Sequence, residues 1–215
     1  MNFLFSRPKI VSIPIYKSDT FFPVNHIYCV GRNYVSHALE MGADKSKPPF
    51  FFSKPSWTIA SGNIQYPRNT IKLQHEVELV LAIGEENSLF GFGIGVDLTR
   101  RDIQEKAKKE GKPWFKGKSF VGSSPISNII PITESFDFST LTIQLMVNGR
   151  LRQLGSCSDM IWSPKDILAE LAMDVPLSPG DLVFTGTPKG VGSLFVGDRV
   201  VATIPDNIEL SFRIQ

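Results

Sequence analysis

The sequence has little net charge, few cysteines and no long apolar run, and each scarcity excludes a class of protein. A net charge of +2 is too small to indicate binding to nucleic acid or to an acidic membrane surface. No apolar run approaches the roughly 18 residues of a membrane-spanning helix, and the N-terminus MNFLFSRPKIVSIPIY lacks the ordered regions of a signal peptide. Cys29 and Cys157 fit no metal or redox spacing, so we expect reduced thiols in a cytoplasmic protein.

What the sequence does contain favours strands and turns. The 215 residues include 17 glycines, 15 prolines and 16 phenylalanines, a composition more typical of a strand-and-turn protein than of a helical one. We find no internal repeat and no low-complexity linker. The predicted fold class is therefore mostly β with a few helices (α+β), with residues 1–24 as an N-terminal strand and loop and residues 25–215 as a single domain.

Local patterns place the expected elements. The predicted strands and extended segments are 26–31, 47–62, about 74–83, about 90–98, and a hairpin over 141–156 that turns at Asn148-Gly149. The predicted helices are 33–42, 100–110 and 163–173. The first helix is expected to begin at Asn33 and to end at Gly42. The second should begin with a capping box of Thr99 and Asp102 and end at Gly111. The third should begin at Ser163, with Pro164 at its first position.

Two carboxylates stand out in the stretch LQHEVELVLAIG, where Glu76 and Glu78 are two residues apart. On a strand such residues share a face, and Val77 and Leu79 then point the other way into apolar surroundings. The face that carries the glutamates is either a solvated sheet face or the wall of a site that holds a cation. The pattern alone leaves both interpretations open.

A third carboxylate follows in FGFGIGVDLT, where glycines alternate with apolar residues up to Asp97. A glycine stripe permits close approach of a neighbouring backbone or of a ligand. If this strand lies beside the Glu76/Glu78 strand, three carboxylates converge, and an all-oxygen set suits Mg²⁺, Mn²⁺ or Ca²⁺. The alternative is that Asp97 only caps the helix that follows.

Other residues could serve chemistry or simply lie on the surface. His37 and Glu40 share a helix face, where a carboxylate can orient an imidazole and raise its basicity; the alternative is an ordinary surface pair. Arg101, Gln104 and Lys118 are donors that could hold an oxyanion or a carboxylate, but each alone could be an exposed polar group. The loop TGTPKGVG could present Thr187 to a substrate, or be a tight turn between strands.

Taken together, these segments resemble the fumarylacetoacetate hydrolase family, specifically its short single-domain branch of acylpyruvases and oxaloacetate-handling enzymes. The matching segments occur in the family's order after residue 25: CVGRNYVSHALEMG, HEVELVLAIG, GVDLTRRDIQ, GKPWFKGKSF, VNGRLRQLGSCSDMIW and GDLVFTGTPKGVG. The chain departs from this pattern in being shorter around 84–91, where relatives usually insert a helix. The resemblance implies a mixed β-sheet roll and a homodimer.

The resemblance also assigns roles to individual residues. It implies that Glu76, Glu78 and Asp97 bind the divalent metal, usually Mg²⁺ or Mn²⁺. His37 and Glu40 resemble the family's water-activating dyad, on a lid that orders over substrate. The remaining implied roles are stabilisation of developing negative charge by Lys118 and Gln104, and substrate contact by Arg32, Arg101 and Thr187.

The implied activity is metal-dependent hydrolysis of the C–C bond of a 3-acylpyruvate, of the acetylpyruvate or fumarylpyruvate type, through a metal-stabilised pyruvate enolate. The same site could decarboxylate oxaloacetate or interconvert its keto and enol forms, because both reactions pass through a similar enolate. A non-enzymatic module that binds a metal or a metabolite is the alternative from another class. The expected partner is a small 2-oxo acid, with no nucleic acid and no membrane.

Overall fold

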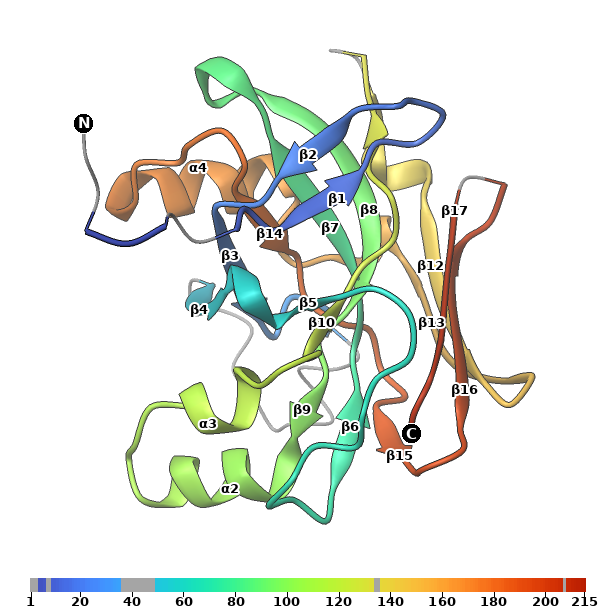
Figure 1. The fold of residues 1–215 in the computed structure, drawn as a ribbon. Coiled ribbons are helices and arrows are strands. Elements are labelled where there is room, and N and C mark those ends of the chain that lie inside the picture. The colour runs from blue at the N-terminus through green and yellow to red at the C-terminus, as the bar shows by residue number, and fades with distance from the viewer. Residues whose placement is uncertain (1–3, 7–8, 36–48, 134–135, 207) are drawn as a thin grey trace.

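The computed structural model describes residues 4–6, 9–35, 49–133, 136–206 and 208–215, and within them the chain is mostly β (Figure 1). The largest sheet has the order β11 (Ile130–Pro131), β8 (Leu89–Val96), β7 (Val77–Ile83), β14 (Leu182–Phe184), β3 (His26–Gly31) and β4 (Phe50–Pro55). It is a mixed sheet, because β14 runs parallel to β3 and antiparallel to β7. The predicted fold class is confirmed.

The other strands form smaller sheets. A four-stranded antiparallel sheet has the order β13 (Arg150–Ser156), β12 (Thr142–Val147), β16 (Arg199–Ile204) and β17 (Ile208–Arg213). A three-stranded sheet has the order β15 (Gly192–Leu194), β6 (Leu73–His75) and β9 (Thr99–Arg100). The two remaining pairs are β1 (Ser12–Pro14) with β2 (Phe21–Pro23), and β5 (Ile59–Ala60) with β10 (Ser124–Pro125).

The described helices are α2 (Arg101–Lys109), α3 (Phe115–Lys118) and α4 (Pro164–Asp174), and single 3₁₀ turns lie at Ser56–Thr58, Glu85–Asn87, Phe138–Thr140 and Cys157–Asp159. In Figure 1, α2 and α3 lie together beside β9 and β6, while α4 lies against the opposite end of the molecule. No helix in the described part of the chain is long and apolar enough to cross a membrane.

The central strand β7 is buried along its whole length because apolar layers cover both faces of the large sheet. Val77, Leu79 and Leu81 join the larger core, which fills the space toward the four-stranded sheet and α4. Val80 and Ala82, on the face that carries Glu78, join a second core beneath the β1–β2 hairpin. The face of the predicted polar pair is therefore not a solvated sheet face.

Neighbouring backbone and side-chain atoms, rather than a ligand, fill the space beside the glycine stripe of β8. A side chain at Gly91 would place its Cβ atom 2.4 Å from the carbonyl oxygen of Ile130, and one at Gly95 would meet the Phe184 ring at 2.6 Å. The absence of side chains thus lets the chain around β11 and the Phe184 ring pack directly on β8. The strand ends at Val96, immediately before Asp97.

The predicted hairpin and the third predicted helix are confirmed, and the caps explain why. Asn148 and Gly149 both have positive φ, as a two-residue hairpin turn requires. Ser163 and Asp166 form a reciprocal capping box at the start of α4, with Pro164 at its first position.

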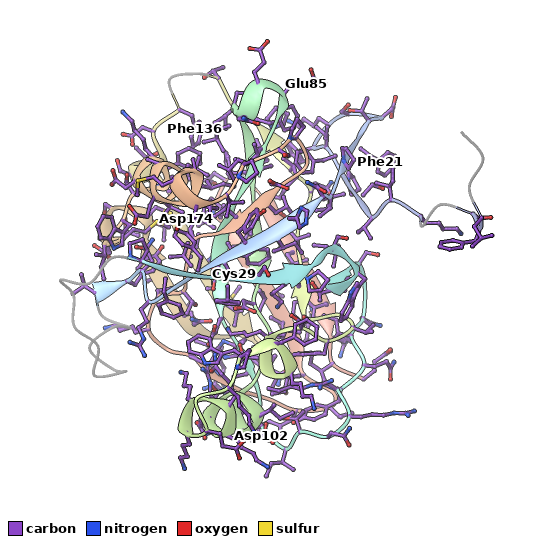
Figure 2. All side chains as sticks on the ribbon, turned by 90° about the vertical axis from the view of Figure 1, so that its left-hand side faces the viewer. Phe21, Cys29, Glu85, Asp102, Phe136 and Asp174 are labelled. Carbon is purple, nitrogen blue, oxygen red and sulfur yellow. The ribbon has the colours of Figure 1, made fainter. Side chains whose placement is uncertain are left out.

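The capping box predicted at the start of α2 is wrong. Thr99 belongs to β9, where it pairs with Gln74, and its hydroxyl donates to the carbonyl oxygen of Asp97. The Asp102 carboxylate, labelled in Figure 2, instead accepts hydrogen bonds from Thr70 and from the backbone N–H of Ile71. Thr99 and Asp102 do not bond to each other's backbone, because the chain is still extended at Thr99 and each side chain bonds to other groups. Gly111, at φ +62°, follows the C-terminal end of the helix as expected.

The predictions for the two cysteines and for the helix over 33–42 have different outcomes. Cys29, near the middle of the molecule in Figure 2, and Cys157 are both free and buried, as expected of reduced thiols. Most of the helix predicted over 33–42 falls on residues 36–48, outside the described residues. Its expected cap, Asn33, is buried, and its carboxamide bonds to Trp162 and to the carbonyl oxygen of Thr185.

Candidate active site

The strand predicted over 74–83 is interrupted at Glu76, and this interruption places Glu76 beside Asp97. Residues before it, in β6, pair with β9 and β15, whereas residues after it, in β7, pair with β8 and β14. At the break, the backbone carbonyl of Glu76 accepts a hydrogen bond from the N–H of Asp97 at 2.8 Å. Glu76 and Asp97 are thereby held side by side, where two sheets diverge.

Glu78 completes a cluster of three carboxylates. It lies opposite Gly95 in the β7–β8 register, and one oxygen atom from each of Glu76, Glu78 and Asp97 lies within 4.8 Å of the others. All three residues are buried. Because the donors are carboxylate oxygens only, the cluster has the chemistry that Mg²⁺, Mn²⁺ or Ca²⁺ prefers over zinc.

Three buried cations accompany the carboxylates. The Lys118 ammonium donates to Glu76 at 2.6 Å, to Asp97 at 2.5 Å and to the Thr99 hydroxyl at 2.8 Å. The Lys54 ammonium donates to the other oxygen of Asp97 at 2.7 Å and to the carbonyl of Ser123 at 2.6 Å. Such charge-assisted bonds are what make buried charges tolerable in a protein interior.

The third cation reaches the cluster from α2. The Arg101 guanidinium pairs with Glu76, donates to Gln74 at 2.6 Å, and donates to the side-chain oxygen of Gln104 at 2.5 Å. Arg101 and Gln104 are one turn apart and form the buried face of the helix, as their spacing predicts.

The three carboxylates differ in how they are compensated. Burial raises the pKa of Glu76, but the Lys118 ammonium and the Arg101 guanidinium outweigh burial and hold that pKa well below its ordinary value. Burial, with repulsion from Asp97 and Glu76, raises the pKa of Glu78 well above its ordinary value. Among the described residues, Glu78 accepts one hydrogen bond, from the backbone N–H of Gly186 at 2.7 Å, and forms no ion pair. Glu78 is therefore the carboxylate whose negative charge is least compensated by the described residues.

A single cavity brings the predicted residues together. Its lining includes the three carboxylates and the predicted contact residues Arg32, Arg101, Gln104, Lys118 and Thr187. The Thr187 hydroxyl accepts a hydrogen bond from the Gln153 amide at 2.8 Å, which fixes its position. His37 and Glu40 lie outside the described residues, so their proximity to this cavity stays a prediction.

Sequence reasoning missed several residues that complete the site. Lys54 is 1% exposed and binds Asp97; it lies between Ser53 and Pro55 in the stretch FFFSKP, whose three phenylalanines hinted at burial but not at the partner. Gln153 bonds His75 and the N–H of Val77 through its side-chain oxygen, tying the glutamate strand to β13. The other missed lining residues are Val30, Gly31, Phe50, Phe52, Lys108 and Trp114.

The chain is similar in sequence to known proteins over most of its length. A family model described as fumarylacetoacetate (FAA) hydrolase C-terminal matches residues 26–215. The chain is 38% identical to oxaloacetate tautomerase YcgM of Escherichia coli over 206 residues, which cover 90% of this chain and 94% of that protein. It is 37% identical to the mitochondrial oxaloacetate tautomerase FAHD1 of Mus musculus over 202 residues, which cover 88% of this chain and 91% of that protein.

Solved structures give the same result. The crystal structure of fumarylpyruvate hydrolase from Pseudomonas aeruginosa, in complex with Mn²⁺ and pyruvate, superposes with a TM-score of 0.94 at 40% sequence identity, and the match covers 99% of each chain. These similarities hold over nearly the full length of all the chains compared.

Proposed function

The chain belongs to the fumarylacetoacetate hydrolase family, and from this premise we propose that it is a divalent-metal-dependent hydrolase that cleaves the C–C bond of 3-acylpyruvates. The observation that carries the proposal is the buried Glu76, Glu78 and Asp97 cluster, set in one cavity with Lys118, Arg101 and Gln104. Glu76 and Asp97 are already paired with buried cations, whereas Glu78 forms no ion pair among the described residues, so a divalent cation bound by all three would compensate Glu78. The donors beside the carboxylates can hold a negatively charged substrate.

We propose Mg²⁺ as the metal, with Mn²⁺ or Ca²⁺ as alternatives, held by Glu76, Glu78 and Asp97. The donor set fits such an ion, and the Pseudomonas aeruginosa hydrolase was crystallised with Mn²⁺. When bound, the cation would supply Lewis-acid polarisation of the substrate's carboxylate and 2-oxo oxygens.

The chain's own residues would do the rest of the chemistry. His37, oriented by Glu40, takes a proton from a water molecule whose oxygen adds to the distal carbonyl carbon. The bond between that carbon and C3 of the pyruvate unit then breaks, and its electron pair passes into the enolate of pyruvate. Lys118 and Gln104 hold the negative charge on the enolate oxygen until C3 takes up a proton, and the products are a carboxylic acid and pyruvate. Arg32, Arg101 and Thr187 hold the substrate's oxygens.

A second candidate function is interconversion of the keto and enol forms of oxaloacetate, or its decarboxylation. It is favoured by the similarity to the two oxaloacetate tautomerases. Neither reaction adds water to the substrate: decarboxylation breaks the C3–C4 bond, releases CO₂ and leaves an enolate that takes up a proton at C3, and tautomerisation moves a proton between C3 and the C2 oxygen. Both would use the metal ligands and Lys118, and neither would need His37 and Glu40 to activate a water molecule. In either case we propose a homodimer that works in the cytoplasm.

A substrate panel tests the proposal. We expect acetylpyruvate or fumarylpyruvate to be cleaved in the presence of Mg²⁺ or Mn²⁺, with activity lost in EDTA and restored by excess metal. The assay follows loss of substrate absorbance and formation of pyruvate, with metal alone as the control, and includes both tautomers of oxaloacetate. Turnover of oxaloacetate without cleavage of any acylpyruvate would select the second candidate function, and no turnover of any substrate would reject both.

His37→Ala tests the dyad. We expect acylpyruvate hydrolysis to fall by about 100-fold or more, because general base catalysis of water attack is lost. Binding of Mn²⁺, measured by calorimetry, should be unchanged, since the proposed ligands are Glu76, Glu78 and Asp97. Hydrolysis at the wild-type rate would remove His37 from the mechanism.

A further inference from the structure

The cavity face of α2 continues one turn beyond the residues already given a role. Arg101, Gln104 and Lys108 lie at positions i, i+3 and i+7, so they share one face of the helix, and all three line the cavity. Arg101 contacts Glu76 at the inner end. Seven residues of helix separate the Cα atoms of Arg101 and Lys108 by about 10 Å along the axis. Lys108 therefore lies toward the end of the cavity away from the carboxylates.

Lys108 is held there by an aromatic wall. Its ammonium lies 4.6 Å from the centroid of the Trp114 ring, and Trp114 packs edge-on against Phe50 at a centroid distance of 5.2 Å. The Arg32 guanidinium lies on the same wall, 5.7 Å from the centroid of Phe50. Two cations thus share one aromatic surface within the cavity, which is a different setting from that of the exposed lysines Lys106 and Lys109 on the same helix.

These two cations have no acidic counterpart in the part of the chain that the structure describes. The acidic residues that line the cavity are Glu76, Glu78 and Asp97, and the first and last of these are already paired with Lys118, Lys54 and Arg101. Burial, with repulsion from Arg101 and Arg32, lowers the pKa of Lys108. The outer end of the cavity is therefore a place where an anion would relieve repulsion between cations.

We propose that Lys108, together with Arg32, binds a carboxylate at the far end of the acyl arm, so that the preferred substrates are 2-oxo acids with a second, terminal carboxylate. This inference rests on the proposed function, because it takes the 2-oxo acid end of the substrate to lie at Glu76, Glu78 and Asp97. An arm long enough to pass Gln104 would lie along Phe50 and Trp114, whose flat faces suit an unsaturated chain. A methyl-terminated arm would leave both cations uncompensated.

The kinetic test compares fumarylpyruvate, which has the terminal carboxylate, with acetylpyruvate, which ends in a methyl group. In Lys108→Met we expect kcat/KM for fumarylpyruvate to fall by about 10- to 100-fold, mainly through KM, and kcat/KM for acetylpyruvate to change by less than about twofold. Lys108→Arg should restore most of the loss. Lys109→Met, one residue along on the exposed face, is the matched control and should leave both substrates unaffected.

A binding test separates this inference from the proposed function. The probes are 2-oxopimelate and 2-oxoheptanoate, which have the same length and differ only in ending with a carboxylate or a methyl group. Calorimetry with the Mn²⁺-loaded protein should give tighter binding of 2-oxopimelate, and Lys108→Met should remove the difference, whether or not the protein hydrolyses acylpyruvates. Equal binding of the two probes by the wild-type protein, or equal weakening of both by Lys108→Met, would overturn the inference.

Discussion

Glu78→Gln should abolish metal-dependent turnover and, at the same time, make the metal-free protein more stable. The substitution keeps the shape of the side chain and an oxygen that can accept the hydrogen bond from Gly186. It removes one of three negative charges that lie within 4.8 Å of one another. Because Glu78 forms no ion pair in the described part of the chain, that charge costs stability whenever no cation balances it.

The expected stabilisation is about 1 to 2 kcal/mol, which for a chain of this size corresponds to a rise in Tm of about 2–4 °C per kcal/mol. Calorimetric melting in EDTA measures it, and titration with Mn²⁺ should show that the wild-type protein gains stability from the metal while the variant gains little. Glu209→Gln, an exposed glutamate on β17, is the control for loss of a charge alone. A lower Tm in EDTA for Glu78→Gln would show that the carboxylate is not under the repulsion described above.

Local patterns were sufficient to predict much of the fold. The hairpin that turns at Asn148 and Gly149 and the helix that begins at Ser163 depend on residues close together in the chain, and both are found. The capping box at Thr99 and Asp102 was wrong because strand pairing with Gln74 keeps the chain extended through Thr99. Tertiary contacts of this kind override the local preference.

Some residues of the candidate site could likewise be predicted from the sequence, and others could not. Glu76, Glu78 and Asp97 could be associated from sequence, because Glu78 lies on β7, Glu76 directly precedes β7, and Asp97 directly follows the neighbouring strand β8. Lys54 could not, because its partner Asp97 is 43 residues away and comes close only through the packing of β4. The interruption at Glu76 was also missed, since the alternating pattern runs through it and only the divergence of two sheets reveals it.

Asp97→Asn should have the opposite effect on stability from Glu78→Gln, although it should abolish metal-dependent turnover just as completely. Asp97 accepts hydrogen bonds from the ammonium of Lys54 through one oxygen and from that of Lys118 through the other. Both lysines are buried, at 1% and 3% exposure. Asparagine carries no charge and turns one acceptor into a donor, so one ammonium would face an N–H group in the interior.

Breaking a buried ion pair by removing one partner typically costs about 3–5 kcal/mol, and we expect a loss of this order, measured by urea unfolding in EDTA. Among the described residues, Lys118 keeps Glu76 as a partner, whereas Lys54 keeps only the carbonyl of Ser123, so most of the penalty should fall on Lys54. The double variant Asp97→Asn with Lys54→Met should therefore recover part of the stability, and the two changes should not be additive. Additive losses, or wild-type stability of Asp97→Asn, would contradict a site in which fixed buried cations neutralise Asp97 and leave Glu78 uncompensated until a divalent metal binds.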